Sequence, residues 1–518
     1  MTISRRRLLG WGAELAAASG CADALSSAVG GAVSVRRRTS VVSAGKAAAP
    51  EWVALGKDLS GALVRPGDTD YAAACQLYNT RFDGLRPASI AYVTGADDIA
   101  TCLAFARRFR VPVAIRSGGH SYAGWSSGDG WLVLDVSLLD TVRLVSSDTA
   151  VTGAGTRLID LYTTLANQDV TVPAGTCPTT GISGLALGGG HGILSRAYGL
   201  TCDNLTAATL VTADGTILDC DPGHSPDLFW ALRGAGNGNF GVVTQLRFRT
   251  HPLTDMMASH LTWPWNSAPS VLRAWQEWGP ELPDHIWSSC SFATTADSTP
   301  HISVTTVAIG APGDLENALD RLTDAVGKSH ATLQLGRSTF LDAIREHAHC
   351  AHHTTPQCHL PGHVPGRNPA GGLTRDTFAA RSGFFDHSLG TAGIHHLIAG
   401  LASFGKRHGH AYIHLTALGG AINRIPPLTT AFVHRSSRFL AQYLTTWTAG
   451  DPGDAQTAWL DGMHAAMRRY ASGAAYQNYT DPALANWRTA YYGNAAHRLA
   501  QIKHRYDPER VFTYPQAF

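Results

Sequence analysis

Two glycine-rich turns constrain this chain more than any other feature of its sequence. The first turn follows an apolar run at residues 111–115. Apolar residues that end at a Gly-Gly pair predict a half-buried strand and a tight turn, where successive backbone N–H groups can converge on an anion. We therefore expect this turn to hold a phosphate group. Its residues are Arg116, Ser117, Gly118, Gly119, His120 and Ser121.

The second turn follows an apolar run at residues 170–174 and is rich in glycine over a longer stretch. Because glycine has no Cβ, its backbone can approach a ligand closely, and so many glycines predict a site for a large flat ligand. The residues that we expect at this ligand are Gly175, Thr176, Cys177, Thr180, Gly181, Gly184, Gly189, Gly190, His191 and Gly192.

The two turns resemble those of the berberine bridge enzyme-like branch of the vanillyl-alcohol oxidase, or p-cresol methylhydroxylase, flavoprotein superfamily. The resemblance continues at residues 198–204, 227–234, 238–244, 476–479 and 506–508. It implies an α+β fold of the p-cresol methylhydroxylase type, with an FAD-binding domain and a separate antiparallel-sheet substrate domain covered by helices. It also implies FAD bonded twice, through its 8α carbon to His120 and through carbon-6 to Cys177, with Val243 and Asn478 beside the cofactor.

The resemblance also suggests how the cofactor is reduced. A flavin accepts hydride from a C–H bond whose neighbouring O–H must lose its proton, so a base is needed. In related sugar oxidases the base is the tyrosine of an Asn-Tyr pair, here Tyr479, with Tyr476 as the second candidate. A phenol is a poor base at neutral pH, so we expect cationic or donor groups that lower its pKa.

Two further positions of the resemblance concern a second base and oxygen. Several relatives carry a carboxylate where this chain has Thr416, so a second, carboxylate base is not expected. In the family the third residue after the flavin-linked cysteine gates oxygen. Here it is Thr180, whose small β-branched side chain favours access of oxygen.

The sequence therefore predicts an FAD-dependent oxidase acting on a small molecule. It would take hydride from an alcohol or hemiacetal of a sugar, oligosaccharide or glycosylated or polycyclic natural product, and reduce oxygen to hydrogen peroxide. The alternatives are an FAD-dependent dehydrogenase, an oxidative-cyclisation enzyme of secondary metabolism, and a non-catalytic sugar-binding relative. A tryptophan cluster can carry sugar rings, although clustered tryptophans more often form core. The cluster is Trp263, Trp265, Trp275, Trp278 and Trp287.

One glycine motif resembles a dinucleotide-binding turn but has the wrong neighbouring elements. Residues 236–241 satisfy Gly-x-Gly-x-x-Gly, which in a dinucleotide-binding domain follows a strand and opens a helix. Here a helix-like segment at 227–233 precedes the motif and a strand-like segment at 242–248 follows it, so we do not expect NAD.

The chain is expected to have four parts: an export signal and linker at 1–49, the FAD-binding domain at 50–250, the substrate domain at 251–473, and a returning segment at 474–518. Ser4–Leu9 resembles a twin-arginine signal and predicts a secreted protein. Cys21 is a candidate for lipid attachment, and residues 22–50 are expected to be a disordered linker. No later apolar run reaches the length of a membrane span.

Charge and cysteine content set further limits. After residue 49 the chain has 34 basic and 37 acidic residues, which gives no support for nucleic-acid binding. Of nine cysteines, Cys350 and Cys358 are the best candidates for a disulfide. A metal site is the alternative, but the segment lacks Cys-x-x-Cys and His-Glu-x-x-His spacing, so we expect no metal and solvated histidines. These are His347, His349, His352, His353, His359 and His363.

Periodicity places the remaining elements. We expect helices at 97–109, 158–167 and 486–504. We expect strands at 111–116, 131–136, 150–154, 301–307 and 410–415.

Overall fold

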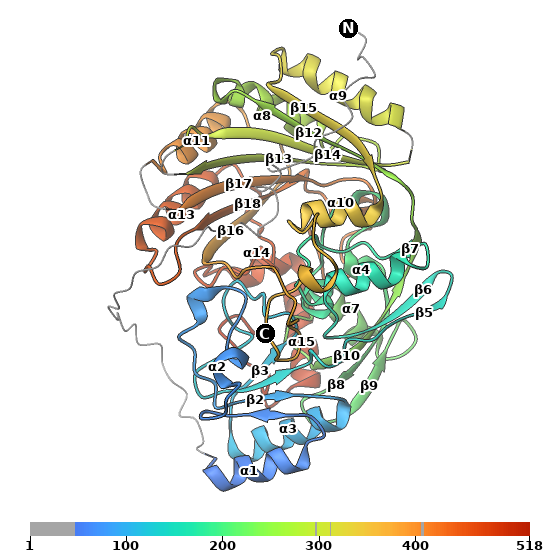
Figure 1. Cartoon of the computed structure of the whole chain (residues 1–518), viewed down its shortest axis with the longest axis vertical. Coiled ribbons are helices and arrows are strands. Elements are labelled where there is room, and N and C mark those ends of the chain that lie inside the picture. The colour runs from blue at the N-terminus through green and yellow to red at the C-terminus, as the bar shows by residue number, and fades with distance from the viewer. Residues whose placement is uncertain (1–46, 296–297, 311, 406–408) are drawn as a thin grey trace.

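In the computed structural model, residues 47–295, 298–310, 312–405 and 409–518 are described, and they form two sheet-containing halves stacked along the long axis (Figure 1). The predicted export signal and Cys21 lie outside these residues. The first described helix, α1, covers Ala49–Asp58 and so includes the last two residues of the predicted linker at 22–50, whose residues 22–46 also lie outside the described part of the chain.

The first half contains two sheets. A four-stranded sheet has the order β1-β2-β4-β3, with β4 parallel to both β2 and β3, and a five-stranded antiparallel sheet has the order β5-β6-β10-β8-β9. The strands are β1 Leu63–Val64, β2 Ser89–Tyr92, β3 Val113–Arg116, β4 Leu132–Asp135, β5 Val142–Ser146, β6 Thr149–Gly153, β8 Leu205–Val211, β9 Ile217–Cys220 and β10 Val242–Arg249. A short antiparallel pair joins β7 Val170–Thr171, which lies within the first half, to β11 His251–Pro252, which directly precedes the second half in sequence.

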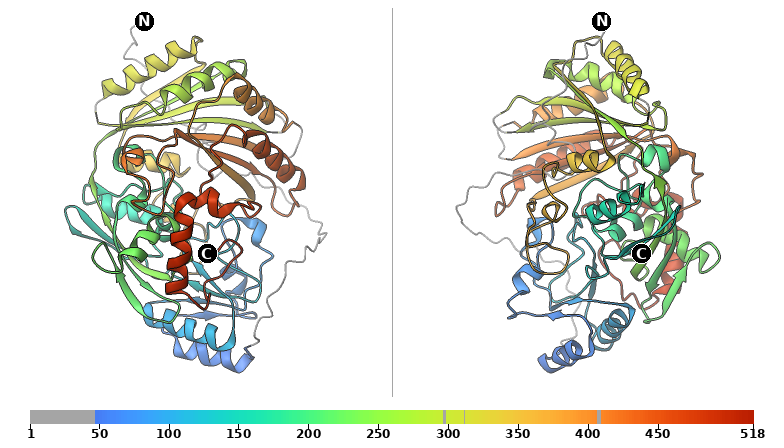
Figure 2. Two further views of the ribbon diagram at one scale, coloured as in Figure 1. Left: turned by 180° about the vertical axis from the view of Figure 1, so that it is seen from behind. Right: turned by 45° about the vertical axis from the view of Figure 1, so that its right-hand side comes forward.

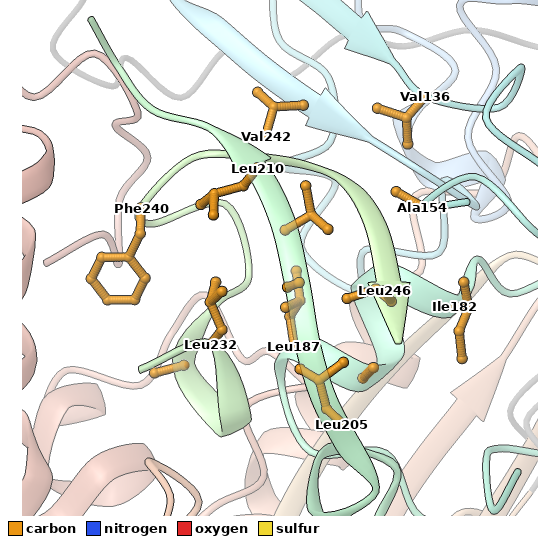
Figure 3. Close-up of a cluster of buried hydrophobic side chains, with 14 of the residues drawn as sticks. Val136, Ala154, Ile182, Leu187, Leu205, Leu210, Leu232, Phe240, Val242 and Leu246 are labelled. Carbon is orange, nitrogen blue, oxygen red and sulfur yellow. The ribbon is translucent and has the colours of Figure 1, made fainter. Parts of the chain in front are cut away.

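Helices of this half pack an apolar face onto the sheets. Figure 3 shows part of this core, where side chains of β8, β10 and two helices meet. Leu187 and Ile182 in that cluster belong to α5 Ile182–Leu187, which directly follows the second glycine-rich turn, so burial of α5 fixes the position of the turn. The other helices are α2 Tyr71–Ala74, α3 Ala96–Phe109, α4 Leu158–Ala166, α6 Ser195–Tyr198 and α7 Pro226–Ala235.

The second half is a seven-stranded antiparallel sheet with the order β15-β12-β14-β13-β17-β18-β16. Its strands are β12 Met256–Trp263, β13 Ile286–Thr295, β14 His301–Ile309, β15 Thr332–Ser338, β16 Phe378–Phe385, β17 His410–Ala417 and β18 Phe439–Thr446. One face packs against four helices, and the other face is turned toward the first half (Figure 1). The four helices are α8 Ala268–Trp278, α9 Pro312–Val326, α11 Thr391–Ala402 and α13 Asp454–Met467; α10 Phe340–His347 and α12 Ala421–Arg424 complete this half.

The last segment of the chain returns to the first half, as the red helices in Figure 2 show. The predicted helix at 486–504 is wrong in one respect, because the structure has two helices, α14 Trp487–Tyr492 and α15 Ala496–Tyr506. Gly493 separates them with a φ of +46°, a left-handed conformation that glycine adopts without a Cβ clash.

The other predicted elements are confirmed within one or two residues at their ends. The Gly-x-Gly-x-x-Gly motif at residues 236–241 follows α7 and precedes β10, so its helix-strand order is the reverse of that in a dinucleotide-binding turn, as expected. Among the described residues, no helix is long and apolar enough to cross a membrane.

Candidate active site

A cavity of about 340 Å³ lies where the two halves meet, and both glycine-rich turns line it. The wall facing the turns comes from the seven-stranded sheet and the returning segment. The predicted site residues that line the cavity are Ser117, Gly119, His120, Ser121, Gly175, Thr176, Cys177, Thr180, Gly181, Gly184, His191, Gly192, Val243, Tyr476, Asn478 and Tyr479.

Four predicted site residues support the cavity instead of lining it. Arg116 is buried in an ion pair with Asp135 on the neighbouring strand β4. A Cβ on Gly118 would stand 2.2 Å from the backbone nitrogen of Gly181, so the two turns contact each other closely there. Gly189 and Gly190 lie behind the cavity wall, where the Gly190 N–H donates to the Tyr476 hydroxyl at 2.8 Å.

A threonine that the sequence did not single out stands between the two predicted attachment residues. The Thr179 hydroxyl lies 2.8 Å from His120 Nε2 and 4.0 Å from Cys177 Sγ. The ring of Tyr78 stacks on His120 with 4.1 Å between centroids. Burial and, secondarily, the charge of Arg157 lower the pKa of His120 to about 3, so its imidazole is neutral.

Tyr479 lies in the cavity wall, but its surroundings differ from the expectation. Its hydroxyl is 2.9 Å from His191 Nε2, and its ring stacks on Tyr122 with 5.3 Å between centroids. The predicted lowering of its pKa is wrong for this structure, because burial raises the pKa of Tyr479 and cations are absent from the cavity wall formed by the described residues.

The described part of the cavity wall carries no Asp, Glu, Lys or Arg side chain. Its hydrogen-bonding groups are neutral, and histidines are prominent among them. Burial lowers the pKa of His191 to about 4, and burial together with the neighbouring His191 and His347 lowers the pKa of His414 to about 3. Thr416, which takes the place of a carboxylate, also lines the wall.

Sequence reasoning missed several site residues: Tyr78, Tyr122, His347, His414 and Gln442 line the cavity, and Thr179 contacts His120 beside it. Strand alternation offered a signal for one of them. His414 and Thr416 are two apart on β17 and face the cavity, whereas Ile413 and Leu415 belong to the core under the helices. Without the strand order, however, the sequence does not indicate that this face meets the two turns.

The cavity wall fits an aromatic cofactor with several polar edges. Three of its side chains have buried carboxamide oxygens that find no hydrogen-bond partner in the described chain: Asn237 Oδ1, Gln477 Oε1 and Gln516 Oε1. A buried acceptor without a partner is costly, and ring or ribityl donors of a flavin dinucleotide would satisfy such groups.

The predicted disulfide is confirmed: Cys350 and Cys358 are bonded. Their sulfurs are thereby removed from any metal site, and the described residues contain no cluster of three His, Cys, Asp or Glu groups suited to a metal. The prediction of solvated histidines is wrong for two residues. His359 is buried and lies 2.9 Å from the Asp160 carboxylate, and His347 lines the cavity.

The tryptophan cluster is mainly core. Trp263 and Trp275 are buried under the helices of the second half, where Trp265 and Trp278 pack against them. Trp287, on β13, is the member that reaches the cavity, and its indole nitrogen is buried without a hydrogen-bond partner among the described residues.

Comparison with known proteins gives two matching family models. Residues 87–221 match an FAD binding domain, and residues 475–517 match the model described as berberine and berberine like.

Full-length relatives agree with these matches. An uncharacterized FAD-linked oxidoreductase of Bacillus subtilis, YgaK, is 30% identical over 89% of this chain and 97% of its own length. A chitooligosaccharide oxidase of Gibberella zeae is 30% identical over 85% of this chain and 88% of its own. The solved structure of Physcomitrella patens BBE-like 1 superposes with a TM-score of 0.81 at 30% identity, covering 90% of this chain and 98% of that one. A xylooligosaccharide oxidase from Myceliophthora thermophila, solved with xylobiose, has a TM-score of 0.78 at 26% identity over 90% of this chain and 98% of that one.

These matches confirm the predicted α+β fold, the FAD and the class of enzyme. The chain belongs to the berberine bridge enzyme-like family of FAD-linked oxidoreductases.

Proposed function

We propose that this protein is an oxidase of neutral saccharides, which moves hydride from an alcohol or hemiacetal carbon to bound FAD and reduces oxygen to hydrogen peroxide. Bound FAD would supply the hydride acceptor. The observation that carries the choice of substrate is the uncharged, hydrogen-bonding wall that the seven-stranded sheet presents to the turns. The similarity to chitooligosaccharide and xylooligosaccharide oxidases supports the same class.

The wall favours neutral substrates on energetic grounds. A substrate ammonium or carboxylate would lose its hydration in the cavity without meeting an opposite charge from the described residues, which is costly. Hydroxyl groups, in contrast, find donors and acceptors at His414, Thr416, Gln442 and the indole N–H of Trp287. Saccharides present many hydroxyls and no charge, so they suit this wall better than alkaloid cations or sugar acids.

We infer that His120 and Cys177 hold the flavin covalently. Thr179 stands beside both residues, and because it contacts His120 Nε2, Nδ1 is the nitrogen that we assign to the bond. The low pKa of His120, caused first by burial, supports this assignment because a neutral imidazole is the nucleophilic form. Two bonds would keep the ring in place without an enclosing lid, which leaves room for bulky substrates.

We further propose Tyr479 as the group that receives the substrate hydroxyl proton and Thr180 as the residue that leaves oxygen a path to the flavin. Both line the cavity. From the sequence alone we also propose export through the twin-arginine signal at Ser4–Leu9 and lipid attachment at Cys21.

The test has two parts, one for the cofactor and one for the substrate. Purified protein should keep its yellow flavin after denaturation in acid, and a variant with both His120→Ala and Cys177→Ala should release it. Neutral mono- and oligosaccharides should then bleach the flavin without oxygen and yield one peroxide per sugar oxidised when oxygen is admitted.

The other outcomes separate the alternatives. Flavin that dissociates freely from the intact protein contradicts covalent attachment. Bleaching without peroxide indicates a dehydrogenase, whereas binding of many saccharides without bleaching favours a sugar-binding relative. Bleaching by cationic alkaloids but by no saccharide would contradict the substrate class.

A further inference from the structure

A histidine and a tyrosine from distant segments meet in the cavity wall. His191 directly follows the glycines at 188–190, and Tyr479 lies in the returning segment 288 residues later. The Tyr479 hydroxyl is 2.9 Å from His191 Nε2, and the two rings meet edge to face with 5.8 Å between centroids. Both residues line the cavity, so a substrate there can reach the pair.

The tyrosine alone makes a poor proton acceptor in this setting. Burial raises the pKa of Tyr479, so its phenolate is not the resting form at neutral pH. A neutral phenol can take a proton only if it gives up its own at the same time, because a phenol oxygen is a far weaker base than an imidazole nitrogen. The proposed reaction therefore needs a second group that takes the phenol proton.

We propose that His191 and Tyr479 form a proton-transfer pair in which His191 Nε2 is the final acceptor. This inference rests on the proposed function. The substrate C–H bond breaks and its hydride goes to FAD, while the substrate O–H bond breaks and its proton goes to the Tyr479 oxygen. The Tyr479 O–H bond breaks and that proton bonds to His191 Nε2, so the substrate loses two electrons and two hydrogens overall.

The surroundings of His191 keep its ring unprotonated before the reaction. Burial lowers the pKa of His191 to about 4, so its ring is neutral before the reaction. The titratable groups that face it are Tyr476 on the returning segment, Tyr479, and His414 on β17, all neutral at pH 7. A substrate hydroxyl becomes strongly acidic as its carbon loses hydride, which drives the proton along the pair, and the resulting imidazolium lies in the same cavity as the charge that the cofactor gains.

The backbone holds His191 in one place. A Cβ on Gly190 would stand 2.3 Å from the Thr201 hydroxyl oxygen, and Gly190 has a φ of +82°, so the turn before His191 tolerates little change. The N–H groups of Thr201 and Cys202 donate to the carbonyls of Gly190 and Gly189. A fixed acceptor keeps the donor-acceptor distance short during transfer.

The kinetic test uses anaerobic stopped-flow reduction of the flavin-loaded enzyme with a saccharide that bleaches the wild type. His191→Asn and Tyr479→Phe should each slow reduction by roughly 10²–10⁴-fold, the range for loss of a general base. The double variant should be little slower than the slower single variant, because the two residues act as one unit.

Two comparisons separate proton acceptance from positioning. His191→Gln keeps a hydrogen-bonding side chain but cannot take a proton, so it should be as slow as His191→Asn; recovery of most of the rate in His191→Gln would reduce His191 to a positioning residue. The matched control is the exposed pair His396 and Tyr470, whose Nδ1 and hydroxyl are 2.6 Å apart outside the cavity. His396→Asn and Tyr470→Phe should reduce at the wild-type rate.

A readout without turnover comes from NMR of protein labelled with ¹⁵N in histidine. The His191 signal, identified by its loss in His191→Gln, should show an unprotonated, hydrogen-bonded Nε2 at pH 7 and should shift in Tyr479→Phe. A protonated Nε2 at pH 7 overturns the proposal even if no substrate is found. Reduction of His191→Asn at the wild-type rate overturns the proton-transfer pair but leaves the proposed oxidase function intact. If no saccharide reduces the flavin, the proposed function is contradicted, and the NMR result alone decides whether the pair exists.

Discussion

A buried ion pair joins the two halves of the molecule behind the active site, and its removal gives a sharp test of the structure. Asp203 lies in the 3₁₀ turn Thr201–Asp203, and Arg435 comes just before β18. The carboxylate oxygens lie 2.6 Å and 2.9 Å from the two terminal guanidinium nitrogens, and the side chains are 3% and 1% exposed. Arg435 also donates to the Phe432 carbonyl at 3.2 Å and to the Thr430 hydroxyl at 2.9 Å.

We predict that Arg435→Leu lowers the free energy of unfolding by about 3–5 kcal/mol, because it leaves the Asp203 carboxylate buried with little compensation. Replacing both partners by leucine should cost less than Arg435→Leu alone, since the uncompensated charge is then gone. The matched control is Arg107→Leu, whose partner Glu509 is 61% exposed. That change should cost about 0–1 kcal/mol.

The assay is urea unfolding of the flavin-loaded protein, followed by tryptophan fluorescence and circular dichroism at one pH and salt concentration. Free energies are compared between variants whose unfolding curves have equal slopes. An Arg435→Leu loss as small as that of Arg107→Leu would refute the reasoning. Because the same 3₁₀ turn binds the carbonyls just before His191, Arg435→Leu should also slow flavin reduction.

Two further predictions concern oxygen and pH. Thr180→Leu should leave the rate of flavin reduction nearly unchanged but slow reoxidation of the reduced enzyme at least tenfold, because the larger side chain fills the cavity side of the second turn. Equal reoxidation rates of the variant and the wild type in stopped flow would mean that Thr180 does not gate oxygen. Burial alone would lower the pKa of His359, but the hydrogen bond and charge of Asp160 raise it above its usual value. A histidine whose pKa is raised in the folded state stabilises the fold at pH values below its unfolded-state pKa of about 6.5, and this stabilisation is lost as the pH rises through the folded-state pKa. His359→Gln should therefore destabilise the protein more at pH 5.5 than at pH 9 in thermal unfolding. A loss of stability that is independent of pH would contradict the ion pair.

Local sequence patterns predict helices and strands well where apolar periodicity or a glycine turn alone decides the local structure. The helix α3 follows from its apolar period after two aspartates, and the strand-to-turn junction at His120 follows from a Gly-Gly pair after apolar residues. The sequence does not predict the break at Gly493, because the buried apolar positions of α14 and α15 keep a helical period across it.

The cavity wall depends on contacts between distant segments, which periodicity does not encode. His414 carries no motif of its own, and it becomes a site residue only when β17 is placed opposite the two turns. The pKa of Tyr479 was mispredicted for the same reason. Its chemistry predicts cationic or donor groups that lower its pKa, but the burial that raises its pKa and the nearby neutral histidine follow from tertiary structure alone.

The distance along the chain between the turns and Tyr479 has a consequence for biosynthesis. A ribosome that adds about 5–20 residues per second needs roughly 15–60 s to pass from Cys177 to Tyr479. During that interval the two turns exist without the wall that closes over them, so we expect a nascent chain to bind FAD loosely and to form the proposed covalent links only after the segment at 474–518 has docked. In the proposed export through the twin-arginine signal, maturation would then precede translocation, and a chain that crossed a membrane unfolded would arrive without its flavin.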